Sequence, residues 1–323
     1  MLPSFSYVRA ESLSDAIDAL SQEGARLHAG GTDLVGCLRD GVLNATTVVS
    51  LSRLTELQDI RQTADGGLRI GALATIDAVS RSSTVQSGYQ ALAMAAAAVA
   101  SPQLRHQGTL GGNLCQKPRC GYYRGDFHCL RKGGDLCYAV DGENARHCII
   151  GGDNCYMVHP SDTATALAAL EATVVIAGPK GERRVPVEAF YVSPADDYTK
   201  ETVLATGEIL TEILLPPPPK GHKSTYRKVR ARGVWDFALA GVALALLIEK
   251  GRVAHCRIVL SGAAPVPFRA TAAEAVLTGK VLNDDIIAET ARAAMKNAAP
   301  MSGNRYKIAM FHSIIEQSLA AMA

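Results

Sequence analysis

The sequence lacks the long apolar run that a membrane-spanning helix needs. Its longest apolar stretches are Ala91–Ala100 and Phe237–Ile248, the second interrupted by one glycine, whereas a span takes about 20 residues. The segment Met1–Tyr7 has neither a basic start nor an apolar core, so we expect no signal peptide and no membrane insertion. A cytoplasmic protein is therefore expected, or a periplasmic one if a partner with a twin-arginine signal exports the folded assembly.

Neither sign of charge is in excess. The 323 residues include 33 basic and 31 acidic side chains, which gives a formal net charge of +2. Proteins dedicated to nucleic acids concentrate basic charge on one face, so this balance argues against nucleic acid as a partner. The chain is 48% hydrophobic and 20% charged, which excludes wholesale disorder and indicates a globular protein of two or three domains.

Two common nucleotide-binding motifs are absent. No two glycines are separated by a single residue, which excludes G-x-G-x-x-G, and the P-loop pattern does not occur. Instead, two Gly-Gly pairs stand beside threonines, in Gly30–Thr32 and Thr109–Gly112. Such segments turn sharply and aim backbone N–H groups at an anion. Each alone also fits an ordinary tight turn, but together they predict a pyrophosphate site on a fold other than the Rossmann fold.

Cys-x-x-Cys pairs are absent too, although cysteine is abundant in one segment. Cys37 and Cys256 lie alone in apolar surroundings, where we expect them to be buried. The other six cysteines indicate a metal site, because a chain without a signal peptide is not expected to keep disulfides. Their wide spacing favours an iron–sulfur cluster over zinc, with no metal as a further alternative. The six are Cys115, Cys120, Cys129, Cys137, Cys148 and Cys155.

Periodicity and turn signals predict the order of the elements. Helices are expected over 12–20, 89–100, 163–170, 271–277, 284–298 and 304–322. Strands are expected over 47–51, 68–72, 173–176, 209–215, 225–232, 237–250 and 252–261. The four prolines at 216–219 predict a stiff connector, and the single tryptophan, Trp235, is expected to pack inside the protein. The cysteine segment shows little periodicity, so we expect an irregular loop that a metal ties down.

As a set, these motifs resemble the FAD-binding medium subunit of the molybdenum hydroxylases, the family of xanthine dehydrogenase, aldehyde oxidoreductase and carbon monoxide dehydrogenase. The similar segments are A-G-G-T within Arg26–Leu34, T-L-G-G-N at 109–113, P-S-D at 160–162, G-E-I-L ending at Leu210, Y-R-K-V-R around Lys228 and F-A-L-A-G-V-A at 237–243. The resemblance spans nearly the whole chain.

The resemblance implies an α+β fold. A vanillyl-alcohol-oxidase (PCMH)-type FAD-binding domain would occupy residues 1–219, in two α/β subdomains at about 1–60 and 61–219, with an iron–sulfur insert at about 115–158. A smaller C-terminal α/β domain of the CO dehydrogenase flavoprotein type would follow over 222–323.

FAD is the cofactor that the resemblance implies, and no residue is assigned as catalytic. Asp162 would meet the ribose hydroxyls of the adenosine, and Lys228 would lie near the isoalloxazine, where a positive charge favours the anionic reduced flavin. The implied FAD residues are Arg26, Leu27, His28, Ala29, Gly30, Gly31, Thr32, Asp33, Leu34, Thr109, Gly111, Gly112, Asn113, Ser161, Asp162, Leu210 and Lys228.

Most members of the family lack the cysteine-rich insert. Here it resembles the insert of 4-hydroxybenzoyl-CoA reductase and of bacterial aldehyde oxidoreductases whose flavin subunit carries a [4Fe–4S] cluster. C-L-R-K-G-G-D-L-C at 129–137 is closer to the reductase, and R-H-C-I-I-G at 146–151 is closer to the aldehyde enzymes. Carried over by position, the cluster ligands are Cys120, Cys129, Cys137 and Cys155, and no ligand role falls on Cys115 or Cys148.

The function implied is that of an electron-transfer subunit. Substrate would be oxidised at molybdenum in a large partner subunit, and electrons would pass through [2Fe–2S] clusters of a small partner to this FAD and on to an external acceptor. Three alternatives stay open: a subunit like that of 4-hydroxybenzoyl-CoA reductase, with electrons running toward molybdenum; a stand-alone FAD oxidase; and a zinc-stabilised binding protein without flavin.

Overall fold

The N-terminal part of the chain forms a small parallel sheet. In the computed structural model, which describes residues 2–323, the strand order is β1-β3-β2. The elements are β1 (Ser6–Arg9), α1 (Leu13–Leu20), β2 (Ala25–His28), α2 (Leu34–Arg39) and β3 (Thr47–Ser50). The Ser12 hydroxyl accepts the N–H of Asp15 at 3.1 Å and so caps α1. The helix and the strand expected in this region are confirmed.

A five-stranded antiparallel sheet follows, in the order β4-β5-β8-β6-β7. Its strands are β4 (Ile60–Gln62), β5 (Leu68–Gly71), β6 (Thr173–Gly178), β7 (Gly181–Pro186) and β8 (Ile209–Leu215). The helices of this part are η1 (Thr55–Gln58), α3 (Ile76–Arg81), α4 (Ser83–Gly88), α5 (Gln90–Ala98), α6 (Pro102–Gln107), α7 (Leu110–Leu114), α9 (Asp162–Ala169), α10 (Val187–Phe190) and α11 (Pro194–Asp197). One apolar core joins the sheet to α5, α7 and α9.

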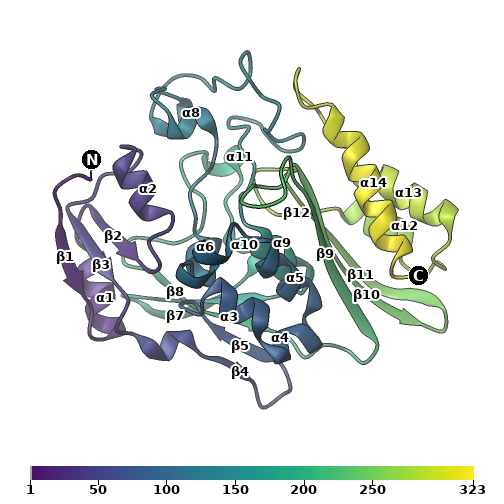
Figure 1. Ribbon diagram of the computed structural model, residues 1–323, viewed down its shortest axis with the longest axis horizontal. Coiled ribbons are helices and arrows are strands. Elements are labelled where there is room, and N and C mark those ends of the chain that lie inside the picture. Colours follow the sequence, from purple (N-terminus) through teal and green to yellow (C-terminus); the bar gives the residue numbers. More distant parts are fainter. Residues whose placement is uncertain (1) are drawn as a thin grey trace.

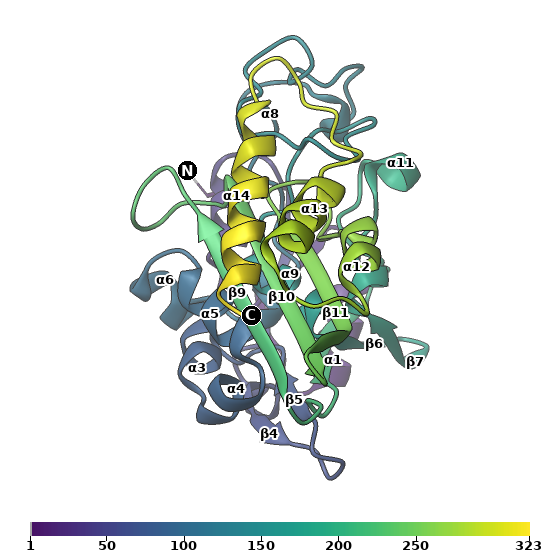
Figure 2. The same ribbon diagram turned by 90° about the vertical axis from the view of Figure 1, so that its right-hand side faces the viewer.

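The C-terminal part is a four-stranded sheet with helices on one face (Figures 1 and 2). Its order is β12-β11-β10-β9, from β9 (His222–Val229), β10 (Ala240–Glu249), β11 (Arg252–Ser261) and β12 (Phe268–Arg269). The helices α12 (Thr271–Leu277), α13 (Asp284–Ala294) and α14 (Tyr306–Ala320) cover its outer face.

Strand β10 shows why both faces of this sheet are buried. Its larger side chains Val242, Leu244 and Leu246 pack against the C-terminal helices, whereas Ala243 and Ala245 face the central core that contains α5 and α9. Alternate residues of a strand point to opposite faces, so the small alanines let α5 and α9 approach the sheet closely. The strand predicted over 237–250 is therefore confirmed for Ala240–Glu249, and residues 237–239 precede it in a loop.

The cysteine-rich insert lies at one end of the molecule, between α2 and the start of α14 (Figure 1). It contains only two short helices, α8 (Gly121–Arg124) and η2 (Leu130–Lys132), and is otherwise irregular. The C-terminal domain holds its second half, because Asn304 donates to the carbonyls of His147 and Cys148 at 3.2 and 3.0 Å. No helix within residues 2–323 is long and apolar enough to cross a membrane.

Candidate functional site

Two pockets meet at the two glycine loops. The first, which we call the glycine pocket, has a volume of about 250 Å³ and lies between the N-terminal sheet and α7. The second, the Lys228 pocket, has a volume of about 260 Å³ and lies between α7, α9 and the C-terminal sheet. Thr32, Thr109 and Gly112 line both pockets. Their shared wall makes one extended site at the junction of the three sheets.

Most of the predicted FAD residues line this site. The glycine pocket contains Arg26, Leu27, Ala29, Gly30, Gly31, Leu34, Gly111 and Leu210; the Lys228 pocket contains Asn113, Asp162 and Lys228; both contain Thr32, Asp33, Thr109 and Gly112. His28 and Ser161 line neither pocket. The His28 ring instead lies edge-on to Tyr7, with 6.2 Å between ring centroids, and its burial lowers its pKa.

The first glycine loop needs its glycines for backbone reasons. A Cβ on Gly30 would lie 2.0 Å from the carbonyl oxygen of Gln107, and Gly31 has a φ of +72°, a conformation that favours glycine. The tight turn carries the chain from β2 into α2. Within residues 2–323, the N–H groups of Thr32, Asp33 and Leu34 have no hydrogen-bond acceptor. This loop therefore presents the free donors that an anion requires.

The second loop differs from the expectation of successive free N–H groups. The N–H groups of Leu110 and Gly111 donate to the carbonyls of Ala74 and Ala72, each at 2.8 Å, in the turn that follows β5. The N–H of Gly112 donates to the Thr109 hydroxyl at 3.2 Å, which caps α7. The loop is thus bound to the central sheet, and its contribution to the site is a close-fitting wall rather than a row of donors.

Asn113 and Ser161 form a support behind that wall. The side-chain oxygen of Asn113 accepts hydrogen bonds from Ser161 at 2.6 Å and from Thr163 at 2.7 Å. The Ser161 side chain is fully buried, and its hydroxyl also caps α9 by accepting the N–H of Ala164 at 3.0 Å. The structure therefore gives Ser161 the task of fixing Asn113 and α9 and does not bring it to the pocket surface.

Asp162 and Lys228 lie side by side, although the resemblance implies that Asp162 meets the ribose and that Lys228 lies near the isoalloxazine. The Lys228 ammonium is 2.7 Å from the Asp162 carboxylate, and the two side chains are only 3% and 5% exposed. The Tyr226 hydroxyl also donates to Asp162, at 2.6 Å. The positive charge expected to act on a flavin is consequently compensated by a carboxylate, because the pair is buried together.

The aromatic wall of the Lys228 pocket was missed by sequence reasoning. Trp235 does not pack inside the protein as expected: it is 60% exposed and has a φ of +53°. It lies with Phe237 in the loop between β9 and β10, at the mouth of the pocket. The guanidinium of Arg232 covers its ring at 5.4 Å. The sequence feature that could have indicated this wall is the run of Arg, Gly and aromatic residues before β10.

Four of the insert's cysteines line one small cavity. They are Cys120, Cys129, Cys137 and Cys155, the four that the family resemblance selects. Burial raises the pKa of the Cys120 thiol to about 11, while the backbone N–H groups of Tyr123 and Tyr122 donate to its sulfur and act in the opposite direction. The Arg131 guanidinium lies 3.9 Å from the sulfur of Cys155. Donors of this kind stabilise thiolates, which are the form that binds metal.

The four thiols of this cavity do not converge on one point. Among the described residues, no three His, Cys, Asp or Glu side chains converge closely enough to hold one metal ion, whereas a zinc site needs three or four ligands around one point. A cubane cluster instead spreads its four thiolates around a larger body. The volume of about 20 Å³ is the space of one water molecule, so the four thiols would move apart around such a cluster.

The remaining cysteines lie elsewhere. Cys115 lines the glycine pocket, and burial raises the pKa of its thiol to about 12. Cys148 is 1% exposed and precedes Ile149 and Ile150, which pack in the C-terminal core. Cys37 and Cys256 are buried, as expected.

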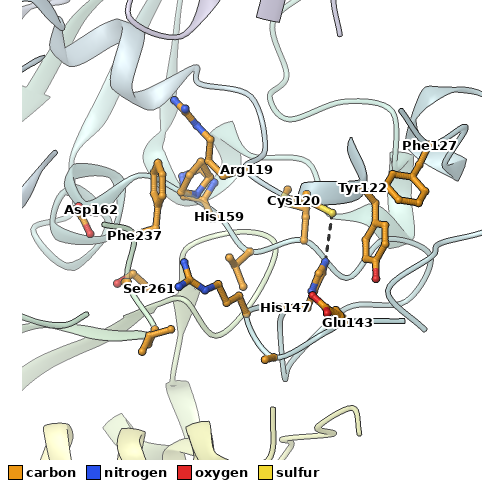
Figure 3. A pocket seen from close by; sticks show the side chains of 18 residues that line it. Arg119, Cys120, Tyr122, Phe127, Glu143, His147, His159, Asp162, Phe237 and Ser261 are labelled. Atoms are coloured by element: carbon orange, nitrogen blue, oxygen red, sulfur yellow. Dashed lines mark hydrogen bonds between the residues drawn. The ribbon is translucent and has the colours of Figure 1, made fainter. Parts of the chain in front are cut away.

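A larger cavity of about 630 Å³ lies between the Lys228 pocket and the cysteine cavity (Figure 3). It shares Asp162 and Phe237 with the Lys228 pocket, and it shares Cys120 with the cysteine cavity. Figure 3 shows Cys120 and His147 pointing toward each other, with 3.3 Å between the sulfur and the ring Nε2. The contact with His147 was not anticipated, since the two residues are far apart in sequence.

Comparison with known proteins assigns both halves of the chain. Residues 3–218 match the family described as "FAD binding domain in molybdopterin dehydrogenase". Residues 198–320 match the "CO dehydrogenase flavoprotein C-terminal domain". The expected fold, a PCMH-type FAD-binding domain followed by a domain of the CO dehydrogenase flavoprotein type, is confirmed.

Full-length relatives agree with this assignment. The chain is 34% identical to the aldehyde oxidoreductase FAD-binding subunit PaoB of Escherichia coli, over 99% of this chain and 98% of that one. It is 30% identical to the glyceraldehyde dehydrogenase medium chain of Sulfolobus acidocaldarius, over 94% and 91%. Among solved structures, a carbon monoxide dehydrogenase from Hydrogenophaga pseudoflava superposes with a TM-score of 0.80 at 28% identity, over 99% and 98%. The chain therefore belongs to the FAD-binding medium subunits of the molybdenum hydroxylases, and it is an oxidoreductase subunit.

Proposed function

We propose that FAD lies across the two joined pockets. Its pyrophosphate would rest between the free N–H groups of Thr32–Leu34 and the Thr109–Gly112 wall, with the adenosine in the glycine pocket beside Leu210. The isoalloxazine would then lie in the Lys228 pocket, against the buried Asp162–Lys228 pair and beneath Trp235. The observation that carries this placement is the shared wall of Thr32, Thr109 and Gly112, because it joins two pockets of similar size into one elongated site.

We further propose that Cys120, Cys129, Cys137 and Cys155 hold a [4Fe–4S] cluster. Their common cavity, the N–H groups directed at Cys120 and the Arg131 guanidinium beside Cys155 support this assignment. Arg131 is itself held by Glu201, at 2.6 Å, and by the carbonyl of Lys200, at 2.8 Å. The residues around the thiols thus supply hydrogen bonds and positive charge, which are the means by which a protein adjusts a cluster's reduction potential.

The chain would act as the electron-transfer subunit of an aldehyde-oxidising complex. PaoB and the glyceraldehyde dehydrogenase chain are named as subunits of aldehyde-oxidising enzymes, which favours an aldehyde over a purine. We propose a large molybdenum subunit and a small [2Fe–2S] subunit as partners, and an external acceptor for the electrons. FAD supplies the chemistry of accepting electrons singly and releasing them in pairs; this chain's own residues bind it, orient it and shield it from water.

Individual Cys→Ser substitutions test the cluster assignment. Iron and acid-labile sulfide per flavin would be measured in the anaerobically purified full chain. Serine at position 120, 129, 137 or 155 should remove most of the iron, because a missing thiolate leaves one iron of the cubane open. Cys115→Ser and Cys148→Ser are the matched controls and should keep it. Loss of iron in Cys148→Ser with retention in Cys155→Ser would show that the chosen set is wrong.

A further inference from the structure

The Asp33 carboxylate has the Cys37 thiol on α2 as a partner at 3.9 Å, and its shorter contacts are all with the cysteine-rich insert. One oxygen accepts the backbone N–H of Lys117 at 2.7 Å. The other lies 2.8 Å from the Arg124 guanidinium and 2.9 Å from that of Arg119. Arg119 directly precedes Cys120, and Arg124 ends the helix α8 that Cys120 begins. Asp33 thus holds both flanks of the first proposed cluster ligand.

Arg124 is fixed in this position by other partners. Its Nε donates to the carbonyl of Pro118 at 2.7 Å, and its Nη2 also reaches the carbonyl of Lys117 at 3.2 Å. Its Nη1 lies 2.9 Å from the buried sulfur of Cys37, on α2. The side chains of Arg124 and Asp33 are only 16% and 17% exposed, so these charge-assisted bonds are shielded from water and strong.

At its other end Asp33 belongs to the first glycine loop. It follows Thr32 directly, its own N–H is among the free donors of that loop, and it precedes the first residue of α2. Any shift of its backbone therefore moves the wall shared by the two pockets. Both carboxylate oxygens accept hydrogen bonds from the insert, so its side chain is oriented by the insert. Its place among the predicted FAD residues is explained by the loop, while its side chain serves the insert.

We propose that Asp33 is a positioning residue that couples the FAD loop to the cysteine site. This inference rests on the proposed function of both sites and adds a link between them. Ordering of the insert around a cluster fixes Arg119 and Arg124, which fixes Asp33 and with it the N–H groups that face the pyrophosphate. The coupling is reciprocal, as linkage requires: a bound cluster strengthens FAD binding, and bound FAD stabilises the cluster by the same factor.

The test compares FAD affinity with and without the cluster. The dissociation constant of FAD would be measured by flavin fluorescence on the full chain, once as purified anaerobically and once after iron removal with a chelator. In the wild type, iron removal should weaken FAD binding on the order of tenfold. In Asp33→Asn, which keeps the shape and loses the charge, the two constants should agree. Arg124→Lys keeps the charge but loses the fork of bonds, and should reduce the coupling as well.

Asp40→Asn is the matched control, since Asp40 lies on the same segment and its only ion pair within residues 2–323 is with the exposed Arg39; it should keep the wild-type coupling. If Asp33→Asn does not fold, Arg124→Lys decides. A wild type without iron would overturn the proposed cluster itself. If the wild type binds iron and iron removal leaves its FAD dissociation constant unchanged, this inference alone is overturned. Undiminished coupling in either variant would also overturn it.

Discussion

The Asp162–Lys228 pair shows how one buried contact changes the expected role of two residues. Each was expected to meet a different part of FAD, yet they lie 2.7 Å apart and are almost fully buried. Removing one partner leaves an uncompensated charge in a low-dielectric pocket, and such a loss costs about 3–5 kcal/mol. The pair therefore contributes to the stability of the domain junction as well as to the ligand pocket.

A double-mutant cycle tests this role. Lys228→Met and Asp162→Asn should each lower the free energy of unfolding of the FAD-free chain, and the double variant should lose less than the sum of the two. Residues in direct contact usually show coupling of at least about 0.5 kcal/mol. Urea unfolding of all four proteins measures it. Additive losses would show that the two side chains act independently.

His159 makes the stability of the chain depend on pH. It is buried with no hydrogen-bond partner for its Nε2 among the described residues, and burial lowers its pKa to about 3. The unfolded chain binds this proton near pH 6.5. Between these values the unfolded state carries more protons, so stability is greatest above pH 6.5 and falls as the pH drops toward 3.

Unfolding by urea at pH 7.5 and pH 5.5 isolates the His159 contribution. From pH 7.5 to pH 5.5, the free energy of unfolding of the wild type should fall by about 1.4 kcal/mol more than that of His159→Phe, whose side chain cannot be protonated. The phenyl ring preserves the edge-on packing against Tyr191, at 4.4 Å between centroids. Equal losses in the two proteins would mean that His159 is protonated in the folded chain.

The short helix α7 contains two adjacent glycines, Gly111 and Gly112, that have different surroundings. A Cβ on Gly111 would lie 2.8 Å from the Cβ of Ala72, at the end of β5, so this glycine allows the helix to pack on the sheet. A Cβ on Gly112 would meet only the Thr109 hydroxyl, at 3.0 Å, and otherwise face the joined pockets. The same dipeptide thus packs on the turn after β5 at one position and faces the joined pockets at the next.

Substitutions at the two glycines should therefore have different effects. Gly111→Ala should lower the melting temperature, while Gly112→Val should fold and lose FAD because its branched side chain enters the site. Thermal melting and bound flavin per chain would be measured for both. A Gly112→Val protein with full flavin content would contradict the proposed position of the pyrophosphate.

Elements with a local signal were predicted correctly, and contacts between distant segments were not. The alternation of buried side chains between the two faces of β10 and the helix cap at Ser12 depend on residues close together in the sequence. Periodicity and capping rules therefore predict them. The link from Asp33 to Arg124 and the pairing of Asp162 with Lys228 depend on how distant segments fold together, which no local pattern records. The cysteine quartet was selected by family resemblance, because spacing alone left the choice open, and Trp235 was misjudged because large aromatic residues are usually buried.

At the scale of the whole molecule, we expect a subunit that works with partners, because its relatives are named as subunits of larger enzymes. Its proposed FAD site lies where the three sheets meet. The insert lies at one end of the molecule (Figure 1). Expressed alone, the chain should bind FAD and oxidise no aldehyde, and turnover should appear only when molybdenum and [2Fe–2S] subunits are added. Steady-state assays with an artificial acceptor measure this. Robust aldehyde oxidation by the isolated chain would favour a stand-alone flavin oxidase.

We propose that this one chain holds both a flavin and a four-iron cluster. Quantification of flavin, iron and sulfide in the anaerobically purified wild-type chain tests it most directly. We predict about one FAD, four irons and four sulfides per chain, as one cubane requires. FAD without iron, or iron without sulfide, would show that the chain does not hold such a cluster.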